Sequence, residues 1–82
     1  MSQNKTYYET QSLPLTATII CLGIPLDSVI KSPDGKSIFV FPRSIELDQI
    51  LENFWKKSLV IEPNTFWEAI RFIKSRIYGG QE

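Results

Sequence analysis

The feature that most constrains the fold is an amphipathic run near the end of the chain, residues 65–78 (TFWEAIRFIKSRIY). At about 100° per residue, four apolar side chains of this run fall within roughly 60° of one another. They are Phe66, Ile70, Ile73 and Ile77. This spacing predicts a helix with one face against a core. Thr65 and Glu68 have the spacing of a capping box at its start.

Aromatic residues also lie outside this core-facing line. Trp67, Arg71, Lys74 and Tyr78 form a second line about a right angle away, and Phe72 lies roughly 120° from the core on the opposite side. One core layer cannot bury side chains on three sides of a helix. The pattern therefore predicts a helix wedged among several elements or one that contributes to an interface.

The preceding residues predict five further elements. Residues 12–22 favour a short buried helix, with Thr10 or Ser12 as cap, Pro14 in its first turn and Gly23 after it. Their β-branched content leaves a strand as the alternative. Residues 26–31 and 37–41 read as a β-hairpin around the turn at 32–36, which holds Pro33 and Gly35. The second segment has apolar residues on both faces, which predicts a strand that is covered on both sides or lies near the middle of the sheet.

A second amphipathic helix is expected from Ser44 to about Lys57, and a third short strand at 58–62. The apolar stripe of this second helix ends with Phe54 and Trp55. The fold class is therefore α+β, in the order α-β-β-α-β-α, with a three-stranded antiparallel sheet packed against helices. One globular domain is expected at 7–79, with a flexible N-terminus at 1–6 and a tail at 80–82.

Composition excludes several classes of protein. The chain has no histidine and one cysteine, Cys21, so zinc, haem and His-based catalytic sites lack their ligands or base. No cofactor or metal is expected. The longest apolar run is residues 19–22, too short to span a membrane. Residues 1–11 lack the pattern of a signal peptide. A cytoplasmic protein without membrane contact is the expectation.

Three other groups favour structural roles. The carboxylates Glu46, Asp48 and Glu52 lie on the polar side of the second helix, at the end that its dipole favours. An enzyme would need these acids to face a pocket. The hairpin turn has one glycine and no helix behind it, so it is not a phosphate loop. Cys21 has apolar neighbours, which raise a thiol pKa and favour simple packing.

The chain from Tyr7 to Tyr78 resembles a family of small prokaryotic proteins classed as a domain of unknown function. The features that carry the resemblance are mostly core and turn residues. They are the apolar helix ending at Gly23, Phe39-Val40-Phe41 after a turn, Phe54-Trp55 closing an amphipathic helix, Val60 and Pro63, and the final Lys74-Ser75-Arg76-Ile77-Tyr78. The resemblance implies a bacterial, archaeal, phage or plasmid setting and brings no catalytic residues.

Two hypotheses of function follow. The first is a non-enzymatic interaction or adaptor module, self-associating or binding another protein, with Trp67, Phe72 and Tyr78 as contacts. The second is a nucleic-acid-binding protein of a mobile element. Its phosphate contacts would be Lys56, Lys57, Arg71, Lys74 and Arg76. Residues 53–82 hold five basic and three acidic side chains, although the whole chain has a formal net charge of zero.

Overall fold

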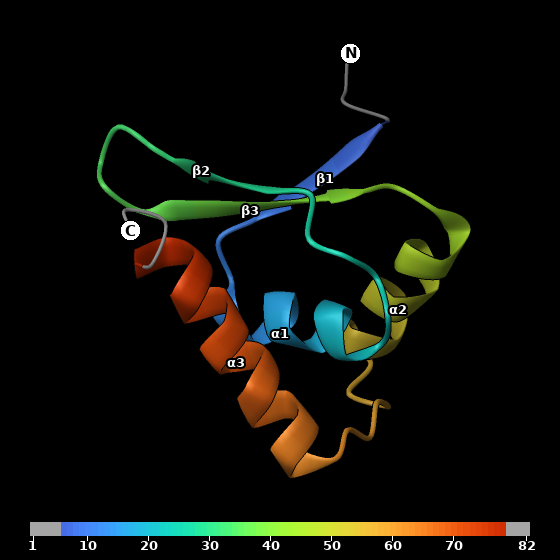
Figure 1. Cartoon of the computed structure of the whole chain (residues 1–82). Coiled ribbons are helices and arrows are strands. Elements are labelled where there is room, and N and C mark those ends of the chain that lie inside the picture. Colours follow the sequence, from blue (N-terminus) through green and yellow to red (C-terminus); the bar gives the residue numbers. More distant parts are fainter. Residues whose placement is uncertain (1–5, 79–82) are drawn as a thin grey trace.

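The computed structural model describes residues 6–78 of the chain (Figure 1). The elements in order are β1 (Tyr7–Thr10), α1 (Leu13–Cys21), β2 (Ser28–Lys31), β3 (Ser37–Pro42), α2 (Ile45–Trp55) and α3 (Pro63–Tyr78). The predicted α+β class is confirmed, with a three-stranded antiparallel sheet and three helices. Of the flexible N-terminus expected at 1–6, residues 1–5 lie outside the described residues, as does the tail at 80–82.

The sheet is built around β3, which pairs with β1 on one side and with β2 on the other. The predicted hairpin is confirmed as β2 and β3. In the turn between them, the Gly35 N–H donates to the Ser32 carbonyl at 2.9 Å. Gly35 has a φ of 87°, a conformation that glycine adopts without a steric penalty. The double-sided apolar pattern of residues 37–41 therefore marks the central strand, as expected.

The third strand lies at a different place from the one predicted. Residues 58–62 form no strand, and the pairing partner of β3 on its second side is β1, with Tyr8 opposite Phe41 and Thr10 opposite Phe39. The run Leu59-Val60-Ile61 has strand-like composition but serves as the connection between α2 and α3. β-Propensity measures the fit to a half-buried sheet surface, and no sheet edge is supplied to this segment.

All three helices lie on one face of the sheet, as Figure 1 shows. Phe39 and Phe41 point from β3 into this layer and are buried. They form the core with side chains from every helix: Leu15, Ala17 and Ile19 of α1, Leu47 of α2, and Ala69, Ile70 and Ile73 of α3. Helix α1 lies between the other two and packs most extensively against α3. The predicted core-facing line of α3 is therefore confirmed.

Residues 12–22 form the predicted helix rather than a strand. Ser12 caps it, since its side chain accepts a hydrogen bond from the Leu15 N–H at 3.2 Å. The buried Thr16 and Thr18 fit inside the helix because their hydroxyls donate to backbone carbonyls one turn earlier, each at 2.8 Å. Their β-branched side chains pack while their polar atoms are satisfied, so the strand-like composition does not decide the structure.

Helix α3 begins two residues earlier than predicted, at Pro63. Glu62 caps it in place of Thr65. The Glu62 carbonyl accepts from the Phe66 N–H at 3.0 Å, and its Oε1 accepts from the Thr65 N–H at 2.8 Å. Hydrogen bonds from the Thr65 N–H, the Asn64 N–H and the Thr65 hydroxyl lower the pKa of the Glu62 carboxyl. Pro63 suits the first helical position because that position needs no N–H donor.

Among residues 6–78, no helix has the length and apolar character needed to cross a membrane.

Candidate interaction surface

The three aromatic residues predicted as contacts are all exposed in the isolated chain. The exposed fractions are 58% for Trp67, 46% for Phe72 and 64% for Tyr78. Ile73, next to Phe72, is completely buried. Helix α3 thus uses one line of side chains for the core and presents aromatic side chains to either side of it.

The exposed side chains of α3 divide between two flanks. Successive helical positions differ by about 100°, so Trp67, Arg71, Lys74 and Tyr78 lie on one flank, while Phe72 lies about 140° from Trp67. Arg76 lies on the Phe72 side, away from the other two cations of the helix. The five predicted phosphate contacts are all exposed, but the three on α3 do not form one stripe.

The end of α2 and the connection to α3 expose apolar side chains that were predicted to lie in a core or in a strand. Trp55, expected in the core stripe of α2, is 67% exposed, and Val60, expected in a strand, is 94% exposed. Trp55 is the last residue of α2, and its ring makes an edge contact with Phe54 at 5.1 Å between centroids. Phe54 contacts the core, so Trp55 is held beside it and directed outward.

A groove of about 570 Å³ opens at this corner of the molecule. It lies where the end of α2, the connection and the start of α3 meet α1. Its lining is predominantly apolar and consists of Thr18, Phe54, Trp55, Lys57, Leu59, Ile61, Pro63 and Phe66. We call it the corner groove. Its size is within the range of ligand-binding pockets, which span about 300–1,000 Å³.

The corner groove offers one cation and few other polar atoms. The Thr18 hydroxyl is already bonded to the Pro14 carbonyl, so Thr18 contributes mainly its methyl group. The Lys57 amine makes no hydrogen bond or ion pair with any residue between 6 and 78. Its neighbour Lys56, by contrast, forms an i,i+4 ion pair with Glu52 at 3.1 Å.

The corner groove is continuous with the Trp67 flank of α3. Pro63 lines the groove, and Trp67 is four residues further along the same helix, which places the two side chains next to each other on its surface. Arg71, Lys74 and Tyr78 extend the same flank. An apolar surface with a border of cations therefore runs from the groove along α3.

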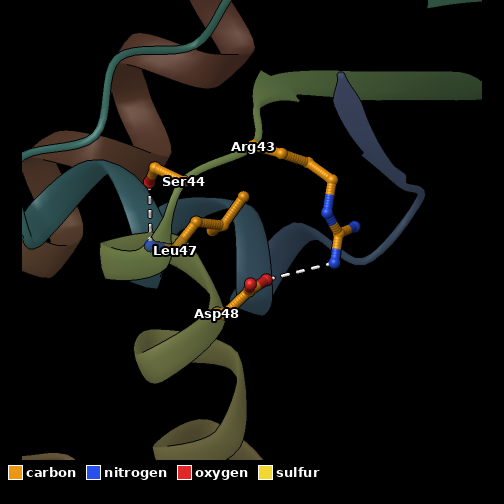
Figure 2. A network of polar contacts seen from close by, with 4 residues as sticks. All are labelled: Arg43, Ser44, Leu47 and Asp48. Carbon is orange, nitrogen blue, oxygen red and sulfur yellow. Dashed lines mark hydrogen bonds and ion pairs between the residues drawn. The ribbon is translucent and has the colours of Figure 1, made fainter. Parts of the chain in front are cut away.

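The carboxylates of α2 do not converge on a shared pocket. Asp48 binds Arg43 at 3.1 Å, next to the Ser44 cap of the helix (Figure 2). Glu52 pairs with Lys56, and Glu46 borders a separate shallow hollow with Pro42 and Ser44. Arg43 also lies over the Tyr8 ring, at 5.4 Å from its centroid. Asp48 thus links α2 to the residue after β3, while Glu46 and Glu52 stay on the exposed surface of α2.

Cys21 lies in surroundings that make its thiol unreactive. Cys21 is half-buried at the end of α1, and burial raises the pKa of its thiol. A high pKa keeps a thiol protonated and weakly nucleophilic. In the part of the chain that the structure describes, no three Cys, Asp or Glu side chains group closely enough to hold a metal ion.

Comparison with known proteins places the chain in a family. Residues 5–79 match the family model described as Domain of unknown function (DUF5659). The chain belongs to this family. The match spans all of residues 6–78, which the structure describes, and agrees with the resemblance noted from the sequence. No curated protein and no solved structure matches the chain significantly.

Sequence reasoning singled out Trp67, Phe72 and Tyr78 as candidate contacts but missed the corner groove. The available signal was the run Leu59-Val60-Ile61, three consecutive apolar residues between two helices. Such a run is expected to be buried, and only its place in the tertiary structure reveals that Val60 is exposed.

Proposed function

We propose that this DUF5659 protein is a non-enzymatic interaction module that binds its own copies or another protein. The observation that carries the proposal is the exposure of Trp67, Phe72 and Tyr78 in the isolated chain. Exposed aromatic side chains next to an apolar groove are typical of protein interfaces, where aromatic residues and arginine serve as anchors. The ion pairs of Asp48 and Glu52 support a structural use of the acids.

Alanine variants of the three aromatic residues test the proposal. Trp67→Ala, Phe72→Ala and Tyr78→Ala are each expected to keep the thermal unfolding transition and to weaken association. Association is measured by light scattering after size exclusion and by native mass spectrometry of the protein purified from its source. Ile45→Ala is the matched control, because Ile45 is an exposed apolar residue at the start of α2, the end of that helix away from the corner groove. Unchanged association in all three variants would refute the proposal.

Nucleic-acid binding is the second candidate. It is favoured by one observation: Arg71 and Lys74 lie on the same exposed flank as Trp67 and Tyr78, so cations and stacking rings are combined. The zero formal net charge and the separate position of Arg76 make it the weaker of the two. Titration of fluorescent single- and double-stranded oligonucleotides at low salt tests it. Binding through these cations is expected to fall steeply with added salt.

A further inference from the structure

Lys57 occupies a backbone position that is normally taken by glycine. Helix α2 ends in a Schellman motif, in which the Ser58 N–H donates to the Asn53 carbonyl at 3.1 Å and the Lys57 N–H to the Phe54 carbonyl at 3.0 Å. The motif requires a left-handed residue after the cap, and Lys57 adopts it with a φ of 61°. It is the one residue other than glycine with a positive φ between residues 6 and 78.

The same motif ends α1 with the usual residue. There the Ile24 N–H donates to the Ile19 carbonyl at 3.3 Å, the Gly23 N–H donates to the Ile20 carbonyl at 3.0 Å, and Gly23 has a φ of 99°. Glycine adopts this conformation freely, whereas a side chain with a Cβ is strained in it. The two helix ends therefore make the same backbone hydrogen bonds. They differ in the residue at the left-handed position, which is glycine after α1 and lysine after α2.

The strained lysine lines the corner groove, where it is the sole charged residue. Strained non-glycine positions tend to lie at functional sites, because the side chain is retained for a purpose other than stability. Lys57 has no acidic partner among residues 6–78, and it lies at an apolar surface. An unpaired amine beside apolar walls favours a ligand that combines apolar groups with a carboxylate.

We propose that the corner groove binds an apolar segment of a partner protein and that Lys57 recognises a carboxylate on that segment. This inference rests on the proposed function and specifies the chemistry of the partner. A protein segment fits better than a small molecule because apolar surface extends beyond the groove to Val60 and Trp67. A small molecule within the groove would leave those side chains exposed. Arg71 and Lys74, on the flank that continues the groove, also complement an acidic partner.

Selection from a random twelve-residue peptide library displayed on phage tests the charge rule. The wild-type protein is expected to enrich peptides in which Asp or Glu stands among apolar residues. Lys57→Glu is expected to enrich Lys or Arg at the same place. Lys31→Glu is the matched control, because Lys31 ends β2 in the hairpin at the far side of the molecule, and it should select as the wild type does. Enrichment without a charge preference, or no enrichment, would overturn the proposal.

Titration with one selected peptide, made synthetically, gives the size of the effect through the fluorescence of Trp55 and Trp67. Replacing its acidic residue by the matching amide is expected to weaken binding about tenfold or more, as for the loss of a hydrogen bond to a charged group. Lys57→Gly should weaken binding similarly while the protein becomes harder to unfold. Equal affinity of Lys57→Gly and wild type for the acidic peptide would contradict the role of the amine.

Sedimentation velocity separates this inference from the proposed function. A dimer that excludes the peptide and dissociates on Trp55→Ser would show that a second copy occupies the groove. That result would overturn the inference and leave the interaction module standing. If the wild-type protein neither self-associates nor binds any peptide, both the inference and the proposed function are refuted.

Discussion

Lys57 is the residue at which the end of α2 and the proposed recognition of a partner meet. Its backbone conformation is set by the two hydrogen bonds that close α2, and the residue lines the corner groove. A glycine would adopt the left-handed conformation more easily but would bring no charged side chain to the groove. If the proposal holds, the residue is a compromise between a stable helix end and a charged binding surface.

Replacing Lys57 by glycine is expected to raise the free energy of unfolding by about 1 kcal/mol, because the left-handed conformation is strained for a residue with a Cβ. Urea denaturation followed by circular dichroism measures the change. Lys57→Ala is the control and should give no such gain, since alanine keeps the Cβ. A less stable Lys57→Gly protein would show that strain is absent at this position.

Glu62 makes the stability of α3 dependent on pH. Hydrogen bonds from Thr65 and Asn64 at the helix start lower the pKa of its carboxyl below the ordinary value of 4.5. The ionised carboxylate is thus favoured in the folded state. Its contribution is fully present above the pKa of the unfolded chain and is lost as the pH falls through the lower pKa of the folded chain.

We expect Glu62→Gln to be less stable than the wild type at neutral pH and to lose less stability when the pH is lowered below about 4.5. The two unfolding curves should therefore approach each other in acid. Chemical denaturation at a series of pH values measures the difference. Glu68→Gln, an exposed glutamate in the next turn of α3, is the control; if it behaved like Glu62→Gln, the effect would not come from the cap.

At the scale of the element, α3 combines a conventional core line with two exposed flanks. The neighbours Phe72 and Ile73 show the division, because one is half exposed and the other is completely buried. The helix is anchored chiefly on α1, and its flanks are available to other molecules. We therefore expect association and folding to depend on different residues of the same helix.

Alanine replacements at these two positions should separate the roles. Ile73→Ala is expected to lower the free energy of unfolding by about 2–5 kcal/mol, because it leaves a cavity in the core. Phe72→Ala should lower it by under about 1 kcal/mol, as for a surface site. Urea denaturation measures both, and helix propensity cancels because alanine is introduced in each. Similar losses would mean that Phe72 contributes to the core.

At the scale of the whole molecule, a single layer of helices covers one face of a small sheet, and neither tryptophan is buried. Trp55 and Trp67 are the two tryptophans of the chain, and both are largely exposed at the end where α2 leads into α3. The core relies on Phe39, Phe41 and aliphatic side chains. Large apolar rings are thus placed where a partner can reach them.

The tryptophan fluorescence of the dilute monomer is therefore expected to resemble that of exposed indole, with a long-wavelength maximum and strong quenching by acrylamide. Unfolding in urea should change it little, whereas association should shift it to shorter wavelength by removing water from the rings. A Trp55→Phe variant assigns the signal between the two residues. A blue-shifted maximum in the dilute monomer would contradict the exposed positions.

The local elements were predictable because their signals lie within a few residues. The Ser12 and Ser44 caps, the stop at Gly23 and the Pro33–Gly35 turn each satisfy nearby backbone groups, and the spacing of Ile70, Ile73 and Ile77 specifies the core face of a helix. Burial then follows from periodicity. These features required no knowledge of distant contacts.

The sequence by itself determined the α+β class, the hairpin with its central strand, and the core face of α3. Only the tertiary structure decided that Tyr7–Thr10 supplies the third strand and that Trp55 and Val60 face outward around a groove. The physical reason is that strand pairing and burial depend on which surfaces the chain brings together. A hydrophobic run such as residues 59–61 has the same local preferences whether or not a sheet edge is there to receive it.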